Sequence, residues 1–132
     1  EAAHGTTFFA TTALIGELLH QPEVLARLKE EAAAVDELTL DSATTALPYT
    51  EACIKEALRL YPFAGSVPKK LPRGERLTVG GYELVGPVDV WLCFSHHFVD
   101  AAVFPEPLRF EPRRWLSDGP SYSSPSSERW LR

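Results

Sequence analysis

An acidic and a basic residue stand three positions apart in an apolar segment that ends at a proline, and this segment constrains the fold more than any other. Glu56 and Arg59 belong to the run E-A-L-R-L-Y-P, which closes at Pro62. Apolar residues recur around the pair at a spacing near 3.6, and proline cannot continue a helix, so we predict a helix from Pro48 to Leu60. The recurring apolar residues are Leu47, Ile54, Leu58 and Tyr61.

The Glu56–Arg59 pair shares one face of this helix and has two interpretations. As a solvent-exposed ion pair it would contribute only about 0.2–0.5 kcal/mol. As a buried pair it would need further hydrogen-bonding partners from elsewhere in the chain, because desolvating two charges is costly. The motif alone favours the exposed pair, whereas its apolar setting favours burial.

The composition is that of an ordinary globular domain. Of the 132 residues, 45% are apolar and 23% are charged, which indicates neither disorder nor a membrane span for the bulk of the chain. No apolar run approaches the ~18 residues of a membrane-spanning helix. The net charge is −5 and no basic stripe is interleaved with aromatic residues, so we expect no nucleic-acid partner.

Cys53 and Cys93 are the only two cysteines, which is too few for a disulfide scaffold and is typical of an intracellular, reducing compartment. Cys53 falls on the predicted helix, and Cys93 falls in an apolar run from Val88 to Phe94 that we predict to be a strand. Neither has the glycine-flanked loop that would leave a thiolate open to a metal. We interpret both as small buried hydrophobic residues. The four histidines show no recognisable metal spacing with them, so we assign no metal ligand.

The chain before the E-x-x-R helix is predicted to be helical. One helix extends from Glu1 to Leu19, a second begins at Pro22, and Asp41-Ser42 is expected to cap a short third helix. The faces expected to be buried are Phe8, Thr12, Ile15 and Leu19 on the first helix, and Val24, Leu25, Leu28 and Val35 on the second.

The chain after Pro62 is predicted to be mixed and irregular. Gly80-Gly81 lies between apolar residues and predicts a small hairpin within the segment from Arg76 to Leu84. Four prolines at positions 87, 105, 107 and 112 predict a meandering course. The segment 117–132 is rich in Ser and Pro, and we expect it to be a flexible tail. The expected fold class is therefore mainly α with a small β element.

Three separated segments, in this order, resemble the second half of a cytochrome P-450, a haem-thiolate monooxygenase. Ala2-Ala3-His4-Gly5-Thr6-Thr7 falls on the A-G-x-[Asp/Glu]-Thr-[Thr/Ser] motif of the distal helix of that family, and Glu56 and Arg59 fall on its E-x-x-R motif. Phe110-Glu111-Pro112-Arg113-Arg114-Trp115 resembles its F-x-P-E-R-[F/W] segment. The resemblance covers the chain from Ala2 to about Trp115 and implies one partial domain over residues 1–132, with the distal helix, the E-x-x-R helix and the meander of that fold.

The resemblance implies haem b as cofactor and a role for several residues near it. Thr6 would present its hydroxyl to oxygen bound over the haem. Ala2 and Ala3 would be small because the helix backbone approaches the haem there, and Lys69 would pair with a haem propionate. On the residues alone, Thr6 would merely bond back to a carbonyl one helical turn earlier.

The resemblance also implies a structural role for the charged pair and a location for the substrate. Glu56 and Arg59 would form a buried triad with Arg114, which has the planar guanidinium fork suited to gripping a carboxylate. The segment with Phe63, Ala64 and Val67 would line a pocket for an apolar substrate such as a lipid, sterol or isoprenoid; the alternative for these three is ordinary core packing.

Three departures from the family pattern affect these expectations. Gly5 stands where the family has an acid, which affects proton delivery, and Arg113 stands where it has a glutamate, which affects packing. The haem-ligand loop F-x-x-G-x-R-x-C-x-G does not follow Trp115, and the chain contains no Met. We therefore expect a fragment of a larger enzyme that lacks the axial cysteine and is inactive alone.

The parent enzyme would hydroxylate an apolar substrate with electrons from a separate reductase or ferredoxin, since the chain shows no nicotinamide or flavin fingerprint. Membrane attachment would be possible only through a segment before Glu1, and the localisation otherwise stays open. The alternative is a non-catalytic remnant, or a helical interaction module, that does not bind haem.

Overall fold

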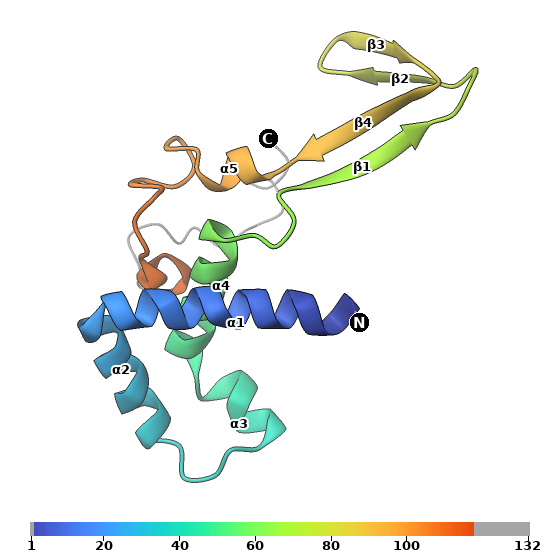
Figure 1. The fold of residues 1–132 in the computed structure, drawn as a ribbon. Helices are drawn as coiled ribbons and strands as arrows, with labels where there is room; N and C mark the ends of the chain where they lie inside the picture. The colour runs from blue at the N-terminus through green and yellow to red at the C-terminus, as the bar shows by residue number, and fades with distance from the viewer. Residues whose placement is uncertain (1, 118–132) are drawn as a thin grey trace.

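The structure is a computed structural model that describes residues 2–117, with the side chains of residues 4–43 and 45–117. Four helices are followed by four strands, a short helix and a 3-10 helix (Figure 1). The elements are α1 (Ala2–His20), α2 (Pro22–Ala33), α3 (Leu40–Thr45), α4 (Pro48–Leu60), β1 (Ser66–Leu71), β2 (Arg76–Val79), β3 (Tyr82–Val85), β4 (Val88–Cys93), α5 (Ser95–Phe98) and the 3-10 helix η1 (Pro112–Trp115). The predicted fold class is confirmed. Apart from Ser117, the predicted flexible tail lies outside the described residues.

Helix α4 occupies the centre of the helical part and contacts α1, α2, α3, α5 and η1. It begins at Pro48, where a first helical turn tolerates proline, and it ends at Leu60, two residues before Pro62. The core cluster that surrounds it consists of Leu18, Val24, Tyr49, Cys53, Ala57 and Phe110. The core is therefore built around the E-x-x-R helix.

The predicted buried faces are wrong in part. On α4 the Glu56–Arg59 pair is buried, as its apolar setting favoured, whereas the recurring apolar residues Ile54 and Leu58 are both 43% exposed. On α1, Phe8, Thr12, Ile15 and Leu19 are all exposed, and Leu14 and Leu18 pack on the core instead. Both helices carry apolar residues on more than one face, so the pattern alone does not choose which face the neighbouring elements cover.

Two details at the ends of α2 and α3 also differ from the prediction. Val35 lies beyond α2, which ends at Ala33. The N-cap of α3 is Thr39 rather than Asp41-Ser42: Thr39 Oγ1 accepts a hydrogen bond from Ser42 N at 3.1 Å, and Ser42 Oγ accepts one from Thr39 N at 2.8 Å. This reciprocal pair is a capping box, which satisfies two backbone donors at once.

The β element consists of two antiparallel pairs that project from the helical part (Figure 1). In the first, β1 pairs with β4, with Ser66 opposite Cys93 and Leu71 opposite Val88. In the second, β2 and β3 form the predicted hairpin, and Gly80 and Gly81 make its turn with φ of 55° and 83°. A two-residue turn of this kind needs positive φ at both positions, which glycine provides without strain.

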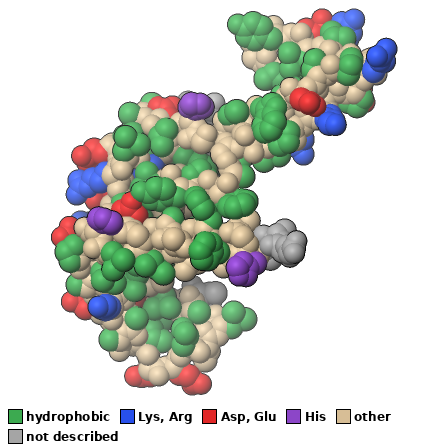
Figure 2. Space-filling view, viewed as in Figure 1, with side chains coloured by type: hydrophobic (Ala, Val, Ile, Leu, Met, Phe, Trp, Pro, Cys, Tyr) green, Lys and Arg blue, Asp and Glu red, His purple; other side chains and the backbone are tan. Residues whose placement is uncertain are grey.

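The strand predicted from Val88 to Phe94 is confirmed as β4, which ends one residue earlier at Cys93. Its partner β1 was not predicted. The prolines and the Lys69-Lys70 pair of the β1 region hide any alternation of apolar and polar residues. Figure 2 shows Lys and Arg side chains at the far end of the strands and hydrophobic side chains exposed on both the strands and the helices. Cys93 is exposed on β4, so its prediction as a buried residue is wrong. Among the helices described here, none has the length and apolar character needed to cross a membrane.

Candidate functional site

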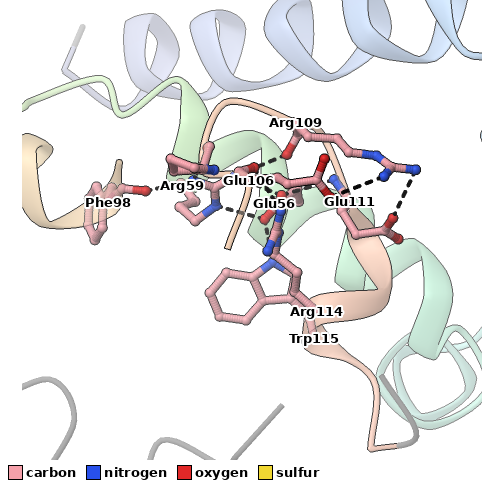
Figure 3. Close-up of polar contacts among 9 residues, drawn as sticks. Glu56, Arg59, Phe98, Glu106, Arg109, Glu111, Arg114 and Trp115 are labelled. Atoms are coloured by element: carbon pink, nitrogen blue, oxygen red, sulfur yellow. Dashed lines mark hydrogen bonds and ion pairs between the residues drawn. The ribbon is translucent and has the colours of Figure 1, made fainter. Parts of the chain in front are cut away.

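The Glu56 carboxylate is completely buried and is the acceptor at the centre of a network between α4 and η1 (Figure 3). Its Oε1 accepts hydrogen bonds from Arg59 Nη2 at 2.8 Å, Glu111 N at 3.0 Å and Arg114 Nε at 3.1 Å. Its Oε2 accepts from Arg59 Nε at 2.9 Å and from Trp115 Nε1 at 2.8 Å. Two guanidinium groups and five hydrogen-bond donors therefore converge on the buried carboxylate.

The guanidinium group of Arg59 likewise uses all of its hydrogen-bond donors. Two of its N–H groups grip Glu56 as a bidentate fork, and the others donate to three backbone carbonyls. These acceptors are Phe98 O at 2.6 Å and Pro107 O at 2.7 Å, both on Nη1, and Arg109 O at 3.3 Å on Nη2. All five guanidinium N–H groups therefore have acceptors. Pro107 O and Arg109 O belong to the meander, the irregular segment of residues 99–111, and Phe98 O belongs to α5, so Arg59 holds both segments against α4.

Arg114 joins the network from η1. Its Nε donates to Glu56, and its Nη2 donates to Glu106 O at 3.0 Å. Glu106 has a positive φ of 49°, which a non-glycine residue rarely adopts, and its carbonyl also accepts from Arg109 N at 3.0 Å. The two hydrogen bonds hold this strained residue in place. The structure thus brings Glu56, Arg59 and Arg114 together, as the resemblance implied.

Several members of this network were not predicted from the sequence. Trp115 and the backbone N–H of Glu111 complete the coordination of Glu56, and the Phe104 ring lies 4.9 Å from the guanidinium carbon of Arg59. A signal for Trp115 was present in the Phe-Glu-Pro-Arg-Arg-Trp segment, because an indole N–H that becomes buried needs an acceptor. The contact with Phe104 has no local signal, since it depends on the course of the meander.

Thr6 lies on α1 at the wall of a hollow of about 530 Å³ between α1 and α4. Three hydroxyls and a set of apolar side chains line the hollow: Thr6, Thr7, Ala10, Thr11 and Leu14 from α1, and Ile54, Ala57 and Leu58 from α4. This volume lies within the range of about 300–1,000 Å³ that is usual for small-molecule sites. The side chains of Ala2 and Ala3, which begin α1, lie outside the described residues.

The other predicted site residues lie apart from this hollow. Phe63, Ala64 and Val67 are exposed in the segment after α4, where the Phe63 ring packs edge-on against Phe9 at 5.9 Å between ring centroids. Lys69 is exposed on β1, opposite Val90 of β4. None of these four residues is among those that line the hollow. The structure therefore places the predicted substrate and propionate residues outside the hollow that Thr6 lines.

The two cysteines differ in environment, and neither lines the hollow. Cys53 is completely buried, and this burial, reinforced by the negative charge of Glu31, raises the pKa of its thiol to about 12. A thiol with so high a pKa stays protonated and is a poor metal ligand. Within residues 2–117, no group of three or more His, Cys, Asp and Glu side chains is arranged to hold a metal ion.

The raised pKa of Cys53 predicts a loss of stability in alkali. Above its ordinary value of 9.0 the thiol ionises in the unfolded chain but stays protonated in the folded chain up to about pH 12, so the free energy of unfolding falls as pH rises between these values. By about pH 10 the effect reaches about 1 kcal/mol. Replacing Cys53 with Ala should make the unfolding temperature fall less steeply over this range, whereas Cys93→Ala should follow the wild type. Parallel curves of unfolding temperature against pH for all three proteins would contradict the raised pKa of Cys53.

Comparison with known proteins decides the family. The model of the cytochrome P450 family matches residues 1–128. This chain belongs to the cytochrome P450 family. Its curated relatives include cytochrome P450 monooxygenase aneG of Aspergillus aculeatus, which is 33% identical over 98% of this chain and 25% of its own length. A flavonoid 3'-monooxygenase of Crocosmia x crocosmiiflora is 36% identical over 80% of this chain and 21% of its own length.

Solved cytochromes P450 share the fold of this chain. A cyanobacterial member, CYP120A1 with bound retinoic acid, has a TM-score of 0.81 and 24% identity, and the match covers 94% of this chain and 28% of that protein. A zebra fish cytochrome P450 with progesterone has a TM-score of 0.77 and 24% identity over 86% of this chain and 27% of its own. This P450 chain spans about a quarter of the length of the relatives that it matches.

The cytochrome P450 family depends on haem, and the hollow between α1 and α4 has a lining whose chemistry suits such a group. Its lining is mainly apolar, which suits a flat porphyrin, and the threonine hydroxyls are its polar part. The family holds the iron by a cysteine thiolate, which needs an open site and a low thiol pKa. Buried Cys53 does not meet these conditions.

Proposed function

We propose that this chain supplies the oxygen-side helix and the structural clamp of a haem-dependent monooxygenase, and that the intact protein inserts one oxygen atom into an apolar substrate. The observation that carries the proposal is the placement of two P450 motifs around one hollow, with Thr6 of α1 on its wall and the saturated Glu56 network on the adjoining helix α4. Curated relatives named as monooxygenases support the same reaction class.

Haem, when bound, supplies the iron at which dioxygen is reduced. The contribution of α1 is a hydroxyl group in an otherwise apolar wall. Thr6 Oγ1 can both accept and donate a hydrogen bond, so it can hold a proton beside the reacting oxygen, while Ala10 and Leu14 exclude water from that wall. Gly5 has no titratable group, so the proton reaches Thr6 through water or another hydroxyl.

The Glu56–Arg59–Arg114 network acts as a structural clamp rather than a catalyst. Every oxygen of Glu56 and every donor of Arg59 is already used within the protein, so neither can bind a substrate without breaking buried hydrogen bonds. Its role in the proposal is to hold the meander and η1 against α4. This fixes the side of the haem site on which the family places its ligand loop.

The proposal of an apolar substrate rests on this chain's own residues. Phe63, Ala64 and Val67 present apolar side chains at the surface directly after α4, and Phe9 of α1 extends this surface. The names of the relatives range from a flavonoid 3'-monooxygenase to a valine N-monooxygenase and do not narrow the substrate further. The electrons would come from a separate reductase or ferredoxin.

The test of the proposed function is the spectrum of the intact protein in its reduced, carbon-monoxide-bound form. We expect haem uptake and the shifted Soret band that reports a thiolate ligand. If the intact protein takes up no haem, the proposed enzymatic function is wrong, and the alternative of a non-catalytic remnant with the same scaffold holds.

Removing the Thr6 hydroxyl should uncouple oxygen consumption from product formation in the intact enzyme. Thr6→Val keeps the size of the side chain and removes the group that holds the proton, so we expect product per electron to fall about tenfold or more while peroxide rises. Thr12→Val is the matched control, because it makes the same change on an exposed position of α1 away from the hollow. If Thr6→Val forms as much product per electron as the wild type, Thr6 has no role in proton delivery.

A further inference from the structure

The first turn of α4 lacks a cap of its own. Leu47 is the N-cap residue and makes no side-chain hydrogen bond to the helix, and Pro48 has no backbone N–H. The next two donors, Tyr49 N and Thr50 N, therefore need an acceptor from outside the helix, because the first N–H groups of any helix have no partner within it.

Glu31 of α2 supplies this acceptor across 18 residues of sequence. Its Oε1 accepts from Tyr49 N at 2.6 Å, and its Oε2 accepts from Thr50 N at 2.7 Å and from Thr50 Oγ1 at 2.7 Å. The carboxylate also lies at the end of α4 where the helix dipole favours negative charge. The cap of the E-x-x-R helix thus belongs to another helix.

A second side chain of α2 holds the same turn. Arg27 lies one helical turn before Glu31, and its guanidinium carbon is 4.1 Å from the centroid of the buried Tyr49 ring. Cation–π contacts of this kind add attraction between the two helices. Helix α2 therefore grips both the backbone and the first aromatic side chain of α4.

The contacts of Glu31 and Arg27 with the first turn of α4 determine where Glu56 lies. Tyr49 precedes Glu56 by seven residues, which is about two helical turns and about 10 Å along a stiff helix. A shift or rotation of the first turn would move the Glu56 carboxylate by a similar amount. The five hydrogen bonds of Glu56 span only 2.8–3.1 Å, so small displacements would weaken several of them together.

We propose that Glu31 is a positioning residue of the haem site, which sets the place of the Glu56–Arg59 clamp from α2. The inference rests on the proposed function, since its effect is read at the haem. It predicts that loss of Glu31 disturbs the thiolate side of the site although Glu31 itself belongs neither to the hollow nor to the clamp.

The experiment compares variants of the intact protein by the reduced carbon-monoxide spectrum and by unfolding temperature. In Glu31→Ala we expect the ratio of the thiolate-shifted to the unshifted Soret band to fall about tenfold, because three charge-assisted hydrogen bonds to α4 are lost. Glu30→Ala, an exposed neighbour on the same helix, should keep the wild-type ratio.

A double variant separates positioning from simple helix capping. Leu47→Asp in the Glu31→Ala background gives α4 a local cap but no link to α2, so it should restore the unfolding temperature and leave the band ratio low. Full recovery of the ratio, or a wild-type ratio in Glu31→Ala alone, would overturn the inference while the proposed function stands. Absence of the shifted band in the wild type would overturn the proposed function itself.

Discussion

Replacement of Glu56 by alanine is expected to abolish haem loading of the intact protein and to destabilise its fold by about 3–5 kcal/mol. The substitution leaves the guanidinium groups of Arg59 and Arg114 buried without a counter-charge. It also removes the acceptor of the Trp115 indole and of the Glu111 backbone N–H. The haem-to-protein absorbance ratio and the midpoint of denaturant unfolding measure the two effects.

The control for this variant is Glu51→Ala on the same helix. Glu51 pairs with Lys55 at 2.8 Å, but both side chains are about half exposed, so its loss should change stability by less than about 1 kcal/mol. Equal effects of the two substitutions, or normal haem loading in Glu56→Ala, would show that the buried network does not support the haem site.

Arg59→Lys is expected to be nearly as damaging as Glu56→Ala, although it keeps the positive charge. A lysine ammonium has three donors and no planar fork, so it cannot serve both oxygens of Glu56 and the three carbonyls of Phe98, Pro107 and Arg109. At least two buried acceptors lose their donors, at a cost of about 1–3 kcal/mol each. Haem loading and the unfolding midpoint should both decrease.

Two conservative variants provide the comparison for Arg59→Lys. Arg109→Lys changes an exposed side chain whose ion pairs with Glu106 and Glu111 lie at the surface, and it should behave like the wild type. The haem loading and the unfolding midpoint of Arg114→Lys should lie between those of Arg59→Lys and Arg109→Lys. The Arg114 side chain makes two hydrogen bonds of the network, whereas Arg59 makes five. An Arg59→Lys protein as stable as the wild type would mean that charge alone, not the guanidinium geometry, maintains the clamp.

The boundaries of several elements followed from local signals. Helix α4 begins and ends at the predicted residues because Pro48 is tolerated in a first turn and Pro62 excludes continuation. The β2–β3 hairpin follows from Gly80-Gly81, whose positive φ values few other residue pairs adopt. In each case the deciding interaction lies within a few residues of the signal, so the local sequence is sufficient to place the ends of the element.

The buried faces and the members of the Glu56 network depended on contacts between distant segments. The apolar repeat of α4 includes Ile54 and Leu58, which stay exposed, whereas the meander and η1 cover the face of Glu56 and Arg59. Trp115 reaches Glu56 over 59 residues of sequence, and Glu31 reaches Tyr49 over 18. No local pattern specifies such pairs, because their geometry exists only after the chain has packed.

By itself, the sequence determined that α4 is a helix, that its acid and base share one face, and that both resemble a motif of a known family. These properties follow from backbone stereochemistry and residue spacing. Only the tertiary structure decided that the pair is buried, since the alternative exposed pair has the same spacing. The physical reason is desolvation: two charges can leave water only where enough donors and acceptors converge on them, and here these come from α5, the meander and η1.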